Sequence, residues 1–265
     1  MPKIGVIGAG MMGGALIRGV LAAGLYTPQE IIVQGRTPTR SREDASRYGV
    51  RAAASLADVT QCDTAIMAVK PAVAPTILQA LAAQRYTGIL VSVVTGCTLA
   101  EMKAALPQAT CVRAMPNTPL AVGAGFTAIA ADAPAEITTQ VQEMFAAMGE
   151  AVVVDEMTLE RLGALAGAGP GYAFVILDAL ADAGVRIGLP RPLALAAAAQ
   201  TLGGAARMQQ ETGLHPAVLR DQVTSPGGTT IAGIAAMEHE GVRTVLGEAV
   251  LAAYRRGAEL RDRHE

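Results

Sequence analysis

The fold of this chain is decided near its N-terminus by the sequence KIGVIGAGMMG, residues 3–13. Residues 3–7 form an apolar, β-branched run that predicts a buried strand, and residues 12–23 place apolar side chains at helical spacing until Gly24. Between strand and helix the first glycine permits a tight turn, the second lets the backbone approach a diphosphate, and the third allows close helix packing. We therefore predict a dinucleotide-binding loop, against the alternative of an ordinary tight turn, made of Gly8, Ala9, Gly10, Met11, Met12 and Gly13.

Strands and helices continue to alternate through residue 155. Further strands are predicted at residues 31–33, 64–69, 89–93, 111–113 and 151–154, with helical segments between them. Parallel strands need crossover helices, so this alternation predicts an α/β, Rossmann-type domain with a doubly wound parallel sheet. From residue 156 onward the pattern is helical throughout, with helices expected at 170–185, 192–212, 216–223, 229–240 and 242–261. We expect two domains, at residues 1–155 and 156–265.

Composition excludes several classes of protein. The chain has 265 residues, of which 51% are hydrophobic and 17% charged, and this balance argues against disorder. A net charge of -2 argues against broad non-specific binding to nucleic acids or acidic lipids. The sequence begins without the pattern of a signal peptide, and its apolar stretches are interrupted before the ~18 residues that a membrane span needs, so neither is expected. The 53 alanines favour closely packed helices and a large subunit interface.

Cysteine and histidine are too few and too scattered for a metal site. The three cysteines, Cys62, Cys97 and Cys111, form no C-x-x-C pair, so neither a disulfide framework nor a zinc site is expected, and a reducing, cytoplasmic location fits. The three histidines show no metal-binding spacing. We expect no metal.

The second predicted strand indicates which dinucleotide is bound. An acidic residue at its end would hold the ribose 2′-hydroxyl of NAD, but residues 34–40 contain none. Arg36 can instead pair with the 2′-phosphate of NADP, and Thr37 can cap the helix that Pro38 begins. We predict NADPH as the preferred cofactor, with NADH possible and a solvated surface arginine as the alternative.

Two further loops follow predicted strands at the edge where α/β sheets bind ligands. Ala68, Val69, Lys70 and Pro71 form the first, and Lys70 is one of only three lysines in the chain. The second contains Asn117 between two prolines, and its amide could contact a ligand. A surface lysine and a structured turn are the corresponding alternatives.

A glycine-rich loop also connects two predicted helices near the C-terminus. It reads Ser225-Pro226-Gly227-Gly228-Thr229-Thr230 and opens a helix. Backbone N–H groups and the positive helix end can hold a carboxylate there, whereas a simple connector needs fewer hydroxyl groups. The chain has no lysine after Lys103, which weakens mechanisms that need a lysine base in the helical domain. Hydride transfer to an already protonated imine needs little such help.

Together these motifs resemble the pyrroline-5-carboxylate reductase family over nearly the whole chain. The resemblance rests on residues 8–13, 68–71, 112–119 and 179–185, and above all on DQVTSPGGTTIAG at residues 221–233. It implies reduction of Δ1-pyrroline-5-carboxylate to L-proline with NAD(P)H, the last step of proline biosynthesis. It also implies a homodimer built by the helical domain, and a possible higher assembly of dimers.

The resemblance further implies residue roles. Thr230 would hydrogen-bond the imine nitrogen, and Lys70 would stand beside the nicotinamide ribose, so both are candidate catalytic residues. Asn117 and Pro71 would flank the same ribose. The substrate carboxylate would be held by the loop residues Ser225, Gly227, Gly228 and Thr229. The loop of one subunit would face the cofactor of the other.

The sequence also departs from the family pattern. Ala166-Gly167-Ala168-Gly169-Pro170-Gly171 stands where the family commonly has Ser-Gly-Ser-Gly-Pro-Ala, and Gly35, Thr95 and Ala124 replace the usual Asn, Ala and Glu. These changes leave room for a reductase of another cyclic imine, and the changed 166–171 segment is what favours a non-catalytic NADP-binding regulator. A hydroxy-acid dehydrogenase of similar plan is a further alternative, and the absence of lysine after Lys103 argues against it.

Overall fold

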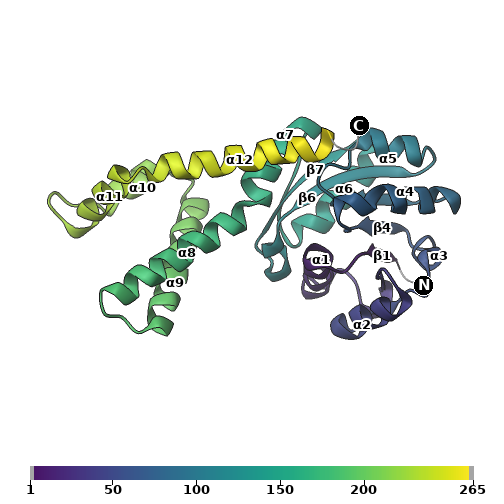
Figure 1. The fold of residues 1–265 in the computed structure, drawn as a ribbon, viewed down its shortest axis with the longest axis horizontal. Helices are drawn as coiled ribbons and strands as arrows, with labels where there is room; N and C mark the ends of the chain where they lie inside the picture. The colour runs from purple at the N-terminus through teal and green to yellow at the C-terminus, as the bar shows by residue number, and fades with distance from the viewer. Residues whose placement is uncertain (1–2, 263–265) are drawn as a thin grey trace. The chain divides into compact units, whose positions relative to one another are not determined.

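A computed structural model describes residues 3–262 of the chain (Figure 1). Its centre is an eight-stranded sheet with the order β3-β2-β1-β4-β5-β6-β7-β8. All neighbouring strands run parallel except β6 and β7. The strands are β1 (Ile4–Ile7), β2 (Ile31–Gln34), β3 (Arg51–Ala52), β4 (Thr64–Met67), β5 (Ile89–Ser92), β6 (Thr110–Pro116), β7 (Gly125–Ala131) and β8 (Gly149–Val153).

Helices cover both faces of this sheet. On one face α1 (Met11–Ala22), α2 (Pro38–Tyr48) and α6 (Ala135–Ala146) bury Leu16, Ala45 and Phe145 in one apolar cluster. On the other face α3 (Leu56–Val59), α4 (Ala74–Ala83) and α5 (Leu99–Ala105) bury Leu56, Leu81 and Met102 in a second cluster. The central strands β1 and β4 are buried along their whole length, as expected for a sheet covered on both sides. The predicted doubly wound α/β fold is confirmed.

Two strands were missing from the sequence prediction. The short β3 pairs with β2 at the sheet edge, and β7 runs antiparallel to β6, so the sheet is not parallel throughout. Between β6 and β7 the chain turns back through a short 3-10 helix, η3 (Thr118–Val122), which ends at Gly123 with φ of 73°. Such a return needs no crossover helix, which is why a helix–strand alternation does not reveal it.

The chain divides into two compact units. The first comprises residues up to Pro170 together with the stretch from Ala252 onward, and the second comprises Gly171–Leu251. The helical part begins at α7 (Glu156–Leu162), close to the expected boundary at residue 155, but α7 stays with the first unit. The reason is that Leu159 is fully buried against Ala128 and Ala130 of β7. A single π-helical turn, η4 (Gly163–Gly167), follows α7.

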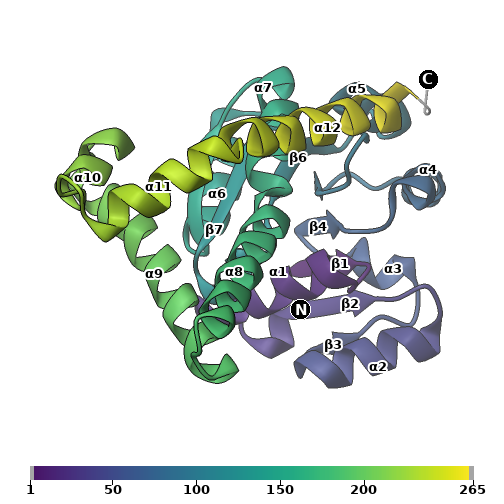
Figure 2. The ribbon, with the colours of Figure 1, turned by 60° about the vertical axis from the view of Figure 1, so that its left-hand side comes forward.

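The second unit is made of helices alone (Figure 2). It contains most of α8 (Gly169–Arg186), all of α9 (Arg191–Thr212), α10 (Pro216–Gln222) and α11 (Thr229–His239), and the first part of α12 (Val242–Asp262). Within Gly171–Leu251 the buried apolar residues are only Ala181, Ala194 and Ala198, whereas Phe174 and Val175 are 63% and 70% exposed. One chain therefore does not cover the apolar surface of this unit.

The helical stretch Glu156–Arg186 is long and apolar enough, by length and composition alone, to cross a membrane. This differs from the sequence expectation, because the helical stretch continues through Gly163, Gly167 and Gly169 and is not interrupted by them. Only 11% of its most apolar window is buried within the chain. A helix that buries its apolar face against another subunit has the same length and composition.

Candidate active site

The glycine loop after β1 has the geometry of a diphosphate cradle. Gly8 has φ of 91°, and a Cβ atom there would lie 2.8 Å from the carbonyl oxygen of Ala68. A Cβ atom at Gly13 would lie 1.9 Å from the carbonyl oxygen of Gly8. At Gly10, which caps α1, a Cβ atom would meet nothing within 4 Å. The first and third glycines are therefore required by packing, and the second leaves open space before the helix N-terminus, where a diphosphate would bind.

The end of β2 presents a cation without a partner in the described chain. Arg36 is exposed, and within residues 3–262 it makes no ion pair. Thr37 caps α2 by accepting a hydrogen bond from the backbone N–H of Arg40 at 3.2 Å, and Pro38 occupies the first turn. The Thr37 cap and the position of Pro38 match the sequence prediction for this segment. Arg40 packs over Gly35, where an added Cβ would lie 2.7 Å from its Cγ, and this explains the glycine at that position.

The two other predicted cofactor loops differ in the exposure and hydrogen bonding of their key side chains. Lys70 is exposed and precedes a 3-10 helix, η2 (Pro71–Val73), that begins with Pro71. Asn117 is buried, and its amide already has protein partners: Nδ2 donates to the carbonyl of Ala166 at 3.0 Å, and Oδ1 accepts from the N–H of Phe126 at 2.9 Å. Asn117 thus ties β7 and η4 to the end of β6.

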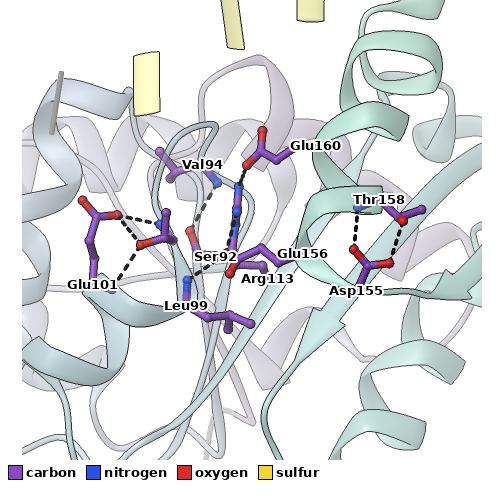
Figure 3. Close-up of polar contacts among 10 residues, drawn as sticks. Ser92, Val94, Leu99, Glu101, Arg113, Asp155, Glu156, Thr158 and Glu160 are labelled. Carbon is purple, nitrogen blue, oxygen red and sulfur yellow. Dashed lines mark hydrogen bonds and ion pairs between the residues drawn. The ribbon is translucent and has the colours of Figure 1, made fainter. Parts of the chain in front are cut away.

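Sequence reasoning missed a buried ion network beside this edge (Figure 3). Arg113 on β6 is only 1% exposed and donates to Glu156 at 2.7 Å and to Glu160 at 2.6 Å, both on α7. Glu156 also accepts from the N–H of Leu99 at the start of α5, at 2.8 Å. Burial alone would lower the pKa of Arg113, but the two carboxylates raise it, so the guanidinium stays charged. In the sequence, the sign of this buried ion network is one charged residue, Arg113, inside an otherwise apolar strand.

A cavity of about 450 Å³ lies within the first unit, at the carboxyl ends of β5 and β6. It is lined by Met12 of α1, Thr95 beyond β5, Met115 and Pro116 of β6, residues of η4 and its flanks, and the last turns of α12. In a doubly wound sheet this edge is the ligand-binding edge. Its volume falls within the range of small-molecule and cofactor sites.

The buried thiols of Cys97 and Cys62 are poor nucleophiles. Burial raises the pKa of Cys97, which follows the β5 loop, to about 11, and it raises the pKa of Cys62 to the same value. Both thiols therefore remain protonated at neutral pH, and thiolate chemistry is not favoured at these positions.

The loop at residues 225–230 belongs to the second unit and forms a turn. The N–H of Gly228 donates to the carbonyl of Ser225 at 3.0 Å, with Pro226 and Gly227, φ 70°, in the centre, an arrangement typical of a type II turn. Gly228 then caps α11, whose first N–H groups, at Thr229 and Thr230, receive no side-chain cap. Because the N–H of Gly228 is used in the turn, the donors left for an anion are those of Thr229 and Thr230 and the hydroxyl of Ser225.

These features define a class: a two-domain, dinucleotide-binding protein with a Rossmann-type unit and a helical unit whose apolar surface requires a partner. Comparison with protein families narrows it. Residues 3–96 match the family described as NADP oxidoreductase coenzyme F420-dependent, and residues 156–260 match that described as pyrroline-5-carboxylate reductase dimerisation.

Individual relatives extend the similarity over the whole chain. The pyrroline-5-carboxylate reductase of Synechocystis sp. is 40% identical over 97% of this chain and 98% of its own length. The one from Escherichia coli K12 is 38% identical over 94% of each. A Coxiella burnetii pyrroline-5-carboxylate reductase structure superimposes with a TM-score of 0.85 at 32% identity, covering 98% of both chains. A Plasmodium falciparum pyrroline carboxylate reductase with NADP bound gives 0.89 at 25% identity, also over 98% of both. The chain belongs to the pyrroline-5-carboxylate reductase family.

Proposed function

We propose that this protein reduces Δ1-pyrroline-5-carboxylate to L-proline with NADPH. The observation that carries the proposal is that the similarity to the family extends over both units. Such a reductase needs the cofactor-binding loop of the first unit and the glycine-rich loop of the second. The substrate imine, NADPH and one proton give proline and NADP⁺. The hydride enters at the imine carbon, and the proton ends on the ring nitrogen. The chain is therefore an oxidoreductase acting on a CH–NH group in proline biosynthesis.

The first unit fits NADP by its own geometry. The open backbone at Gly10 and the N-terminus of α1 would hold the diphosphate, with Ala9, Met11 and Met12 completing the loop. Arg36, free of any acidic neighbour on its strand end, would pair with the 2′-phosphate, and Thr37 would support it at the start of α2. Ala68, Val69, Lys70 and Pro71 would approach the nicotinamide ribose from β4. When bound, NADPH supplies the hydride.

Asn117 has a different place in this proposal from the one its sequence suggested. Its two amide bonds to protein make it a support for the loop that faces the cofactor. A direct contact with the nicotinamide ribose would have to use its remaining N–H. We therefore assign Asn117 two roles: it supports the loop, and its remaining N–H contacts the cofactor.

The turn at residues 225–230 would bind the substrate. Its carboxylate would accept hydrogen bonds from the N–H groups of Thr229 and Thr230 and from the hydroxyl of Ser225, with Gly227 and Gly228 giving the backbone its bend. The Thr230 hydroxyl would hydrogen-bond the ring nitrogen and hold the imine carbon at the right distance from the cofactor. Such positioning supplies much of the rate in a reaction that needs no protein base.

Assembly follows from the helical unit. The matched dimerisation domain and the exposed apolar helices support a homodimer, and we propose that the loop of one subunit faces the cofactor of its partner. A larger ring of dimers and a cytoplasmic location are further parts of the proposal.

The test is NADPH oxidation at 340 nm with Δ1-pyrroline-5-carboxylate, repeated with NADH and with a cyclic imine that lacks the carboxylate. We expect fast turnover that needs the carboxylate and prefers NADPH. Faster turnover of the imine without a carboxylate would favour the second candidate, a different cyclic-imine reductase. Ala168, which lines the cavity at a position where the family pattern has serine, favours that candidate. NADPH binding without turnover of either imine would contradict both.

A further inference from the structure

The cavity at the ends of β5 and β6 is mainly apolar, which makes its few polar groups informative. Methionine, valine, proline, alanine and glycine supply most of its wall. The polar side chains are Thr95, Glu160, Tyr254 and Arg256, and Glu160 is the only carboxylate among the lining residues. Arg256 is neutralised by Glu259 at 2.5 Å. A single carboxylate in an apolar pocket indicates a specific hydrogen-bond donor on the ligand.

Glu160 is held in place by a buried cation. Its Oε1 accepts from Nη2 of Arg113 at 2.6 Å, and its side chain is 11% exposed. In Figure 3 the other carboxylate oxygen points away from Arg113. Because Arg113 is itself fixed by Glu156, the orientation of Glu160 is set before any ligand binds. The second oxygen is therefore a preorganised acceptor.

Thr95 supplies a complementary group. It lies on the loop between β5 and α5, is half-buried, and lines the same cavity as Glu160. In the part of the chain that the structure describes, no hydrogen bond of its hydroxyl is found. A hydroxyl can donate where a carboxylate can only accept. The pair thus matches a ligand that carries both a carbonyl oxygen and an N–H group, as a primary carboxamide does.

The position of the cavity selects which half of the dinucleotide enters it. This step rests on the proposed function. Arg36 follows β2, on one side of the glycine loop in the sheet order, and would hold the phosphate of the adenosine half. The cavity lies on the opposite side, beyond β5 and β6. A dinucleotide that crosses the sheet at the loop after β1 would therefore bring its nicotinamide ring to the cavity.

We propose that Glu160 and Thr95 bind the nicotinamide carboxamide and fix the orientation of the ring. The outward oxygen of Glu160 accepts from the carboxamide N–H, and the hydroxyl of Thr95 donates to its carbonyl oxygen. This contact decides which face of the ring is presented to the substrate.

The test compares binding of NADP⁺ with binding of its 3-acetylpyridine analogue, in which a methyl group replaces the carboxamide NH2. We would measure both by titration calorimetry on the dimer. The wild type should bind the analogue about tenfold more weakly, as expected for one lost hydrogen bond to a charged group. Glu160→Gln keeps an acceptor for Arg113 but turns an NH2 group toward the cavity. The Glu160→Gln variant should bind NADP⁺ as weakly as the wild type binds the analogue.

The second variant separates the two contacts. Thr95→Val keeps the shape of the side chain and loses the hydroxyl, so it should weaken NADP⁺ and the analogue by the same factor, and Thr95→Ser should restore both. Glu136→Gln is the matched control, because Glu136 is exposed on α6 and does not line the cavity. Equal binding of both dinucleotides by the wild type would overturn the inference. Failure of the wild type to bind NADP⁺ at all would instead overturn the proposed function.

Discussion

At Gly13 a single methyl group has no room. An added Cβ would lie 1.9 Å from the carbonyl oxygen of Gly8, a backbone atom just after β1, and 3.3 Å from the side-chain Cβ of Ala68, just after β4. Gly13→Ala must therefore push α1 away from β1. We expect a loss of about 1–3 kcal/mol in the free energy of unfolding and loss of NADPH binding. Urea unfolding and fluorescence titration with NADPH would measure the two effects.

Gly10→Ala is the matched control for this prediction. Its Cβ would meet nothing within 4 Å, so the fold should keep its stability, while the methyl group should occupy space that the diphosphate needs. Weak NADPH binding with normal unfolding is the expected result for Gly10→Ala. If Gly13→Ala were destabilised but Gly10→Ala bound NADPH normally, the glycine loop would be a packing feature only.

Thr230 stands at the second position of α11, with its side chain exposed. If its hydroxyl orients the imine, Thr230→Ala should lower kcat at least about tenfold, because one transition-state hydrogen bond is lost, and Thr230→Ser should recover most of it. NADPH affinity should not change, since the residue lies in the substrate loop. Steady-state kinetics with a parallel NADPH titration would decide, and an unchanged kcat would remove Thr230 from the reaction.

At the scale of elements, the entry to β2 depends on a charged cap. In the 3-10 helix η1 (Pro28–Glu30), Glu30 accepts from the backbone N–H and the hydroxyl of Thr27 and pairs with Lys3 at 2.7 Å. The hydrogen bond from Lys3, followed by those from Thr27, lowers the pKa of Glu30 from 4.5 to about 2. A carboxylate with a lowered pKa in the folded state stabilises the fold above its unfolded pKa, and this contribution is lost as the pH falls from 4.5 toward 2.

Glu30→Gln replaces the carboxylate by an amide that does not titrate. The variant should be less stable than the wild type at pH 7, and its unfolding free energy should depend less on pH between 5 and 3. Urea unfolding at several pH values would measure both, with Glu136→Gln, an exposed carboxylate, as the control. The same pH slope in the wild type and in Glu30→Gln would show that the cap contributes nothing to the acid stability of the fold.

Elements that have a local sequence pattern could be predicted, whereas elements that depend on pairing with a distant segment could not. The strand–glycine–helix unit at residues 4–22 and the caps at Thr37 and Gly213 follow from neighbouring residues. The antiparallel β7 does not, because its strand is rich in alanine and its partner β6 arrives by a turn rather than a crossover. The ion network of Arg113 joins residues 43 and 47 positions apart, so no local spacing encodes it.

The same limit applies to the candidate site. Sequence patterns placed the glycine loop, Arg36 and the turn at 225–230, each of which is a short continuous segment. The cavity wall combines the start of α1, the ends of β5 and β6, η4 and the last turns of α12. Thr95 and Glu160, the two polar lining residues to which we assign a role, come from different elements and line one cavity only after the sheet and α7 have packed. Their role is visible only in three dimensions.

At the scale of the whole molecule, the two units differ in how they are stabilised. The first has two large apolar clusters between its sheet and helices. The second buries three alanines and leaves side chains such as Phe174, Val175, Val218 and Met237 exposed in a single chain. A unit that buries so little apolar surface by itself gains its stability by association. Its thermal midpoint should therefore rise with protein concentration, whereas that of a self-sufficient monomer would stay constant.

Phe174→Glu tests this dependence directly. Phe174 is 63% exposed on α8, so a charge there costs little in an isolated subunit but would be desolvated in a dimer interface. We expect the dimer dissociation constant to rise at least about tenfold, to be measured by sedimentation equilibrium. Turnover should fall with the dimer fraction and recover at high protein concentration. Phe174→Leu keeps an apolar side chain and should remain dimeric. A Phe174→Glu variant that stays dimeric at all concentrations would move the interface away from this face of α8.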